Sequence, residues 1–178
     1  FKELSLYTNV KKNTKMFFLT TCGWMMWNWT VSNLLLGSSI VLYDGSPFFP
    51  RANRIINISK KTKTTMLGAG AKIYETIQNI HKSQTKNVLK NIECFISTGS
   101  PLSPETFKFI NKKLNSNAFI YSVSGGTDIV SCFMLGVPTL PVFAGEIQGP
   151  GLGMNIDVFD EKGKPTNETG ELVCKTPF

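Results

Sequence analysis

Short apolar segments alternate with longer amphipathic segments along most of this chain. Runs of strand length occur seven times, at 16–20, 40–43, 64–68, 94–98, 118–123, 156–160 and 171–174. Segments with apolar residues at helical spacing lie between the first five runs, at about 24–36, 50–60, 70–82 and 103–114. This alternation is typical of a parallel sheet with flanking helices, so we predict an α/β fold.

The amino-acid composition of the sequence changes after Pro138. Glycine and proline gather between 138 and 153, which is typical of loops. Beyond them, the last two apolar runs flank Glu161-Lys-Gly-Lys164, the pattern of an antiparallel pair around a turn. We predict an α/β subdomain over 1–145 and the start of a β-rich subdomain over 146–178. Both are expected to be partial, because the chain begins without Met and stops just after a predicted strand.

Residues 16–43 carry no charge, which raises the question of a membrane span. Polar and small residues such as Thr21, Asn28 and Asn33 interrupt this segment, and they are costly in lipid. The segment fits a buried strand, helix and strand better. We therefore expect no membrane span.

The charge is unevenly distributed, with a net value of +7. Residues 1–90 hold 13 Lys and Arg against 3 Asp and Glu, whereas residues 91–178 hold 6 against 9. A basic half can indicate nucleic acid or an anionic cofactor. However, the arginines number only two (Arg51 and Arg54), and the lysines are scattered without interleaved aromatic residues. We interpret them as a solvated surface and expect no nucleic-acid partner.

The four cysteines lie far apart and form no Cys-x-x-Cys pair. Cys94 and Cys174 fall in predicted strands, so we expect small buried hydrophobic side chains in a reducing compartment. No secretory signal pattern is visible, and we expect a cytoplasmic protein. The single histidine, His81, has no candidate partner nearby in the sequence, so metal binding through it is not expected.

Candidate chemistry is concentrated in Tyr121-Ser-Val-Ser-Gly-Gly-Thr-Asp128, which follows a predicted buried strand. Open α/β sheets bind ligands beyond the carboxyl ends of their strands. Gly125 and Gly126 allow close backbone approach to a ligand. Thr127 offers a hydroxyl donor to a phosphate oxygen, and Asp128 an oxygen ligand suited to Mg²⁺. A turn followed by a helix cap would give the same pattern.

A second motif, Cys94-Phe-Ile-Ser-Thr-Gly-Ser-Pro-Leu-Ser-Pro104, also breaks from a strand into a loop of small residues. A helix is predicted to follow, with Ser103 as N-cap and Pro104 at its first position. The two loops can form two walls of one nucleotide pocket. They can equally be two ordinary loops of an α/β sheet.

Five motifs in collinear order resemble those of the adenylate-forming acyl-CoA synthetases, and most closely the members that act on acetoacetate. The motifs are Thr21-Cys-Gly-Trp-Met-Met-Trp-Asn-Trp29, Leu42-Tyr-Asp-Gly-Ser-Pro47, Ser97-Thr-Gly-Ser-Pro101, Ser124-Gly-Gly-Thr-Asp128 and Thr169-Gly-Glu-Leu172. The resemblance covers nearly the whole chain. It implies part of the large N-terminal domain of such an enzyme.

The resemblance implies an acid–thiol ligase that uses ATP, Mg²⁺ and CoA to activate acetoacetate or a similar short-chain acid. Thr127 and Asp128 would be catalytic, with Thr127 on the α-phosphate and Asp128 holding the metal. The nucleotide would be bound by Gly99, Ser100, Pro101, Ser124, Gly125, Gly126 and Thr127. The acid would be bound by Trp24, Met25, Met26, Thr98 and Gly125. From the residues alone, the aromatic and Met cluster at 24–29 is explained by core packing.

Two details of this resemblance depart from the family pattern. Asp128 stands where many relatives carry Glu, and Ser124 where many carry an aromatic residue that stacks on adenine. Gly125 is expected to leave the acyl pocket open to a chain longer than acetate. The keto oxygen of acetoacetate would need a donor, with Ser124, Thr98 and Asn28 as candidates.

Other parts of the family's active site have no counterpart in the sequence. The phosphate-binding loop, the ribose-binding Asp and the C-terminal domain with its Lys are expected outside these residues. We therefore expect the chain to be an internal fragment that is inactive alone. The alternatives are another acyl-CoA synthetase, specific for acetate or another short-chain acid, and a non-catalytic remnant of the fold.

Overall fold

Five parallel strands form the central sheet of the computed structural model, which describes residues 1–81 and 87–178. The strand order is β2-β1-β3-β4-β5. Their bounds are β1 Lys15–Phe18, β2 Ser39–Val41, β3 Met66–Gly70, β4 Cys94–Thr98 and β5 Phe119–Ser122. Every neighbouring pair is parallel. The predicted α/β class and the first five predicted strands are confirmed, each to within a few residues.

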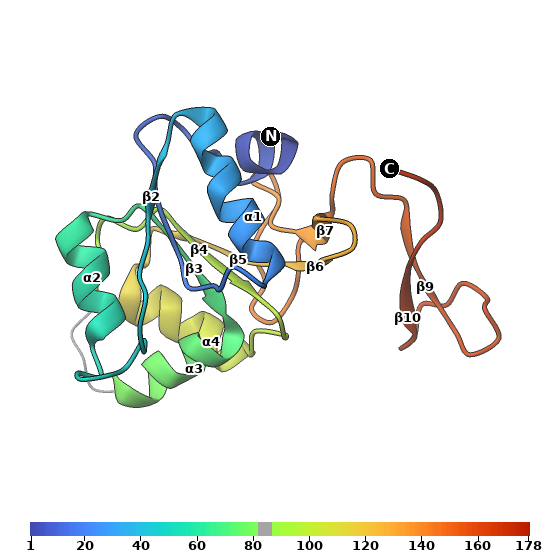
Figure 1. Cartoon of the computed structure of the whole chain (residues 1–178). Helices are drawn as coiled ribbons and strands as arrows, with labels where there is room; N and C mark the ends of the chain where they lie inside the picture. The colour runs from blue at the N-terminus through green and yellow to red at the C-terminus, as the bar shows by residue number, and fades with distance from the viewer. Residues whose placement is uncertain (82–86) are drawn as a thin grey trace.

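Helices cover both faces of this sheet (Figure 1). One face carries α1 (Met25–Ser32), which continues as a 3₁₀ turn (Asn33–Leu36), and the short N-terminal π-helical turn η1 (Glu3–Tyr7). The other face carries α2 (Arg54–Thr62), α3 (Ala71–Ile80) and α4 (Pro104–Phe109), which continues as a π-helical turn (Ile110–Leu114). The sheet is therefore the middle of three layers.

The side chains of β1 show how the sequence produces these layers. Phe17 packs into the cluster beneath α2, α3 and α4, whereas Met16 and Phe18 pack beneath α1. Because successive side chains of a strand point to opposite faces, a strand buried on both faces is an unbroken apolar run. Gly68 on β3 makes room for this packing, since a Cβ there would lie 2.0 Å from the Phe18 ring.

The helix ends agree with the sequence signals in part. Ser103 caps α4, its hydroxyl accepting from the Thr106 N–H at 3.2 Å, and Pro104 is the first helical residue, as predicted. The helix predicted from residue 50 begins at Arg54 instead. The helix predicted over 70–82 ends at Ile80, and residue 82, like Lys86, lies outside the described residues.

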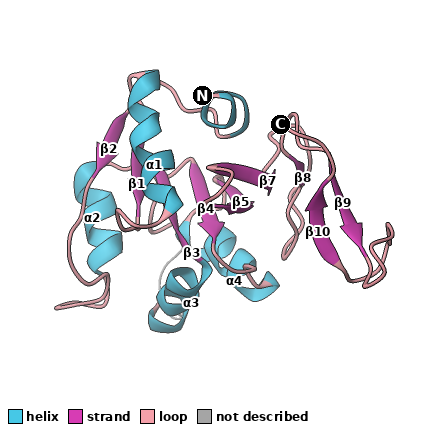
Figure 2. Cartoon of the chain, turned by 45° about the vertical axis from the view of Figure 1, so that its right-hand side comes forward, coloured by secondary structure: helices cyan, strands magenta, loops and turns pink. Residues whose placement is uncertain are grey.

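A second region follows β5 and consists of antiparallel strands (Figure 2). A three-stranded sheet contains β6 (Ser124–Gly126), β7 (Ser131–Leu135) and β8 (Gly149–Pro150), none of which was predicted. The predicted pair is present as β9 (Ile156–Phe159) and β10 (Glu171–Cys174). The division at residue 145 stays a prediction, and β8, from beyond it, pairs with β7.

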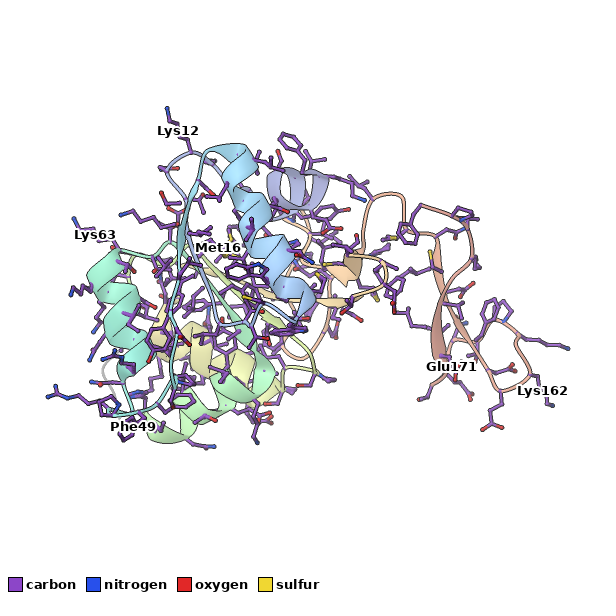
Figure 3. All side chains as sticks on the ribbon, viewed as in Figure 1. Lys12, Met16, Phe49, Lys63, Lys162 and Glu171 are labelled. Carbon is purple, nitrogen blue, oxygen red and sulfur yellow. The ribbon has the colours of Figure 1, made fainter. Side chains whose placement is uncertain are left out.

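The lysines and cysteines follow the sequence predictions except at Cys174. Lys12, Lys63 and Lys162 project from separate parts of the surface, whereas Met16 lies inside (Figure 3). Cys94 is buried as predicted, but Cys174 is only half-buried, because it lies in the two-stranded β9–β10 pair. All four thiols are free.

Among the described helices, none has the length and hydropathy to cross a membrane.

Tyr74 of α3 connects this helix to the middle of the sheet. Its ring is fully buried, and its hydroxyl lies 2.8 Å from the carbonyl oxygen of Leu67 and 3.2 Å from that of Ile96. Burial, the largest cause, raises the pKa of Tyr74 well above its ordinary value, so the phenol stays a neutral donor. This contact fixes α3 across β3 and β4.

We expect Tyr74→Phe to lower the free energy of unfolding by about 1–2 kcal/mol, because it removes a buried hydrogen bond without changing the ring. Thermal or denaturant unfolding of the complete gene product measures the change. Tyr43→Phe is the matched control, since the Tyr43 hydroxyl donates to the Ser46 carbonyl oxygen at the surface. Equal effects of the two substitutions would contradict a structural role for the buried phenol.

Candidate functional site

A pocket of about 500 Å³ opens at the carboxyl ends of β4 and β5. Four segments line it: the start of α1, the loop after β4, the segment from the end of β5 through β6, and the loop before β8. The lining residues are Trp24, Met25, Met26, Thr98, Gly99, Ser100, Pro101, Ser122, Val123, Ser124, Gly125, Gly126, Thr127, Gly145 and Ile147. Every predicted site residue except Asp128 is among them.

The loop after β4 is held by its neighbours on both sides. Thr98 donates its hydroxyl to the carbonyl oxygen of Val123 at 2.9 Å, which joins the ends of β4 and β5. Gly99 has a φ of +84°, and a Cβ there would lie 3.5 Å from the Trp24 ring. A backbone with positive φ favours glycine. This loop can therefore approach a ligand with its backbone rather than with side chains.

The start of α1 serves both the core and the pocket. Met25 and Met26 are buried, and both also line the pocket. Trp24 precedes the helix in extended conformation, and its ring meets that of Phe18 edge-on at 6.2 Å. Core packing and pocket lining are thus compatible for this cluster. Figure 1 shows the first turn of α1 near β6.

Gly125 lies where strands β6 and β7 approach each other closely. It pairs with Cys132 of β7, and a Cβ at Gly125 would lie 2.2 Å from the Ser131 carbonyl oxygen. A side chain at this position would therefore meet the backbone of β7. The glycine thus permits the close approach of two strands, and the expectation that it leaves room for a longer acyl chain stays a prediction.

The turn that carries Thr127 and Asp128 joins β6 to β7. Strand β7 follows it, so the alternative of a helix cap is wrong. Both side chains are exposed, and the N–H of Val130 donates to the Thr127 carbonyl oxygen at 3.1 Å. Val130 has a φ of +46°, an unusual value for a β-branched residue. Thr127 lines the pocket, and Asp128 follows it in the turn, outside the lining.

The pocket lining contains no charged side chain. Its polar groups are hydroxyls and backbone amides, with apolar side chains on the α1 side. Asp128 is near but outside the lining, and neither ion pair found within the described residues involves it. Those residues also contain no cluster of three acidic, His or Cys side chains that could hold a metal ion alone. A cation here would need ligands from a bound anion as well.

Sequence reasoning missed four lining residues. Ser122 and Val123 lie inside the motif after β5, and their position at the end of a strand was a usable signal. Gly145 and Ile147 come from the glycine- and proline-rich passage, where no periodic pattern exists. Gly145 has a φ of +94°, and a Cβ there would lie 2.9 Å from the Pro104 ring. This loop therefore packs against the start of α4.

Comparison with known proteins gives consistent matches. The family model described as AMP-binding enzyme matches residues 4–178. The chain is 43% identical to an acetoacetyl-coenzyme A synthetase of Rhizobium meliloti over 180 residues, which cover 99% of the chain and 28% of that protein. It is 42% identical to the acetoacetyl-CoA synthetase of Gallus gallus, covering 99% of the chain and 27% of that protein. The chain thus spans about a quarter of the length of these relatives.

Solved structures agree with these matches. The acetoacetyl-CoA synthetase from Streptomyces lividans superposes with a TM-score of 0.86 at 41% identity, covering 99% of the chain and 28% of that structure. A benzoate CoA ligase from Burkholderia xenovorans gives a TM-score of 0.80 at 18% identity, covering 95% of the chain and 34% of that structure. At that identity the comparison shows the fold alone.

The two glycines of β6 make a matched pair for substitution. We expect Gly125→Ala to lower the unfolding free energy by about 1–3 kcal/mol, because the new methyl group meets the β7 backbone. Gly126→Ala should change it little, since nothing lies within 4 Å of a Cβ there. Thermal unfolding of the complete gene product compares the two. If Gly125→Ala proves as stable as Gly126→Ala, the strands do not approach as closely as described.

Proposed function

Since the chain belongs to the family of AMP-binding enzymes, we propose that it forms part of an ATP-dependent acid–thiol ligase that converts acetoacetate to acetoacetyl-CoA. The observation that carries the proposal is that eleven of the twelve predicted site residues line one and the same pocket. The similarity to acetoacetyl-CoA synthetases over 99% of the chain supports the choice of acid.

The proposed reaction has two steps. A carboxylate oxygen of the acid attacks the α-phosphorus of ATP, giving an acyl-adenylate and releasing pyrophosphate. The thiolate of CoA then attacks the acyl carbon, and AMP leaves. Such chemistry depends on positioning and on neutralising charge at phosphate rather than on a protein nucleophile. The hydroxyls and amides of the lining can orient both substrates, whereas the charge on phosphate has to be neutralised by groups outside the lining.

The residues divide between the two substrates. The adenosine part would lie against Gly99, Ser100, Pro101 and the β6 backbone, where glycines allow close approach. Thr127 would donate its hydroxyl to an α-phosphate oxygen. Trp24, Met25 and Met26 would form the apolar wall for the acid, with Met side chains that adapt to the shape of the ligand.

The keto oxygen of acetoacetate needs a donor, and three observations support one of the three candidates. Thr98 already donates its hydroxyl to Val123. Asn28 is exposed and does not line the pocket. Ser124 is half-buried and lines the pocket, so we assign the donor to Ser124.

Magnesium would be held by Asp128 together with phosphate oxygens of the bound nucleotide. The fit is chemical: a carboxylate is a hard oxygen ligand, and this one lies beside the proposed phosphate position without an ion-pair partner among the described residues. When bound, the ion would neutralise charge on the phosphates. The four free thiols fit a reducing compartment, and the cytoplasm is the proposed location.

Acetoacetate-dependent exchange of pyrophosphate into ATP, measured on the complete gene product, tests the proposal. We expect exchange with acetoacetate to exceed exchange with acetate in kcat/KM. A preference for acetate or another short-chain acid would identify a different acyl-CoA synthetase. No exchange with any of these acids, in a folded protein, would favour a non-catalytic remnant.

We expect Thr127→Ala and Asp128→Asn each to reduce kcat/KM for this exchange by more than about tenfold, equivalent to about 1.4 kcal/mol of transition-state stabilisation. Asp128→Asn should also raise the Mg²⁺ concentration needed for half-maximal rate. Asp128→Glu is the control, since it keeps the carboxylate and should retain most of the activity. Unchanged kinetics in both variants would show that the turn does not contact transferring phosphate.

A further inference from the structure

The carboxylate of Glu3 connects two pocket-forming elements that are far apart in the sequence. Oε2 of Glu3 accepts a hydrogen bond from Nε1 of Trp29 in α1 at 3.2 Å. Oε1 accepts from the hydroxyl of Ser131 and from the backbone N–H of Cys132 at 3.4 Å, both in β7. A single side chain of η1 therefore holds α1 on one side and β7 on the other.

Each partner lies next to part of the pocket. Trp29 is one turn beyond Met25 and Met26, which form the apolar wall. Ser131 and Cys132 are paired with Gly126 and Gly125 of β6. The distance between the helix and the three-stranded sheet thus determines the distance between two walls of the pocket, and Glu3 spans that distance.

The hydrogen bonds to Glu3 require a strong acceptor inside the protein. The Trp29 side chain is buried, so its N–H needs an acceptor inside the protein. A carboxylate offers two oxygens and accepts stronger hydrogen bonds than a neutral group. The neighbouring contacts hold η1 in place: Lys2 donates to the Leu152 carbonyl oxygen, and Tyr7 packs on Cys132 and Leu135. Burial, followed by the nearby Glu3 carboxylate, raises the pKa of Cys132 to about 12, so this thiol is an inert neighbour.

We propose that Glu3 is a positioning residue for the adenylation pocket, which sets the separation of α1 and β6 without touching the substrates. This inference rests on the proposed function. Glu3→Gln keeps one carbonyl acceptor, which can accept from the Trp29 N–H or from the Cys132 N–H but not from both. Ala keeps neither contact. The two substitutions therefore form a graded series.

Steady-state kinetics of the complete gene product test the inference, at a temperature well below the unfolding midpoint of every variant. For Glu3→Ala we expect the KM for acetoacetate to rise by about tenfold, because a displaced wall misplaces the acid. Glu3→Gln should give an intermediate rise. Trp29→Phe, which removes the indole donor together with part of a buried ring, should raise KM by a larger factor in the wild type than in the Glu3→Ala background. Glu75→Gln is the control, because Glu75 pairs with Lys72 on the solvent side of α3.

A second measurement does not depend on activity. In the unliganded protein, Glu3→Ala should accelerate amide hydrogen exchange in residues 25–32 and 124–132 while leaving α3 unchanged. Lower thermal stability with unchanged KM and unchanged local exchange would overturn the inference and leave Glu3 a simple tether of η1. If the wild type shows no exchange of pyrophosphate into ATP, that result would count against the proposed function instead. The hydrogen-exchange comparison would still decide the role of Glu3.

Discussion

Parallel pairing of β1 to β5 is the constraint from which the rest of the arrangement follows. Parallel strands need a crossover between each pair, and their faces must both be covered, so helices lie above and below the sheet. The same pairing brings the carboxyl ends of β4 and β5 to one edge. The loop at 98–101 and the segment at 122–127 consequently meet there, and the start of α1 closes the third side.

The pocket owes its shape to backbone more than to side chains. Gly99 and Gly145 adopt positive φ, and Gly125 lets two strands approach closely. No charged side chain enters the lining, so any electrostatic selectivity must come from hydroxyls, amide dipoles and groups at the rim. Such a surface selects ligands by their shape and by the geometry of their hydrogen bonds rather than by their charge. Small displacements of its supporting strands therefore matter more than they would in a site dominated by one strong ion pair.

Elements with a clear apolar pattern of their own were predicted from the sequence. Elements that form only because a neighbouring strand pairs with them were missed. Strand β4 was located to the residue, because a strand buried on both faces is a continuous apolar run. Ser124-Gly-Gly has no such pattern, and β6 exists because β7 lies beside it. The π-helical turn at Glu3–Tyr7 is too short for a periodic signal. The direction that a side chain at Gly125 would take depended on this unpredicted pairing. The two loops were placed at one edge by the predicted parallel strands, and Trp24, Met25 and Met26 were added by the family resemblance.

The pair β9–β10 has a consequence for the association of the molecule with itself. It forms a sheet of two strands, and of residues 155–178 none is buried. Residues 164–166 cover part of the outer edge of β9, where the Thr166 N–H donates to the Val158 carbonyl oxygen at 2.8 Å and Pro165 bridges Phe159. The outer edge of β10 pairs with no described strand, and such an edge can add a strand from another chain. Asp157 and Lys175 form an ion pair across these strands at 2.9 Å, and Glu171 begins β10. Charges at these positions resist the dry stacking that intermolecular sheets require, and so favour a dispersed chain over an aggregated one.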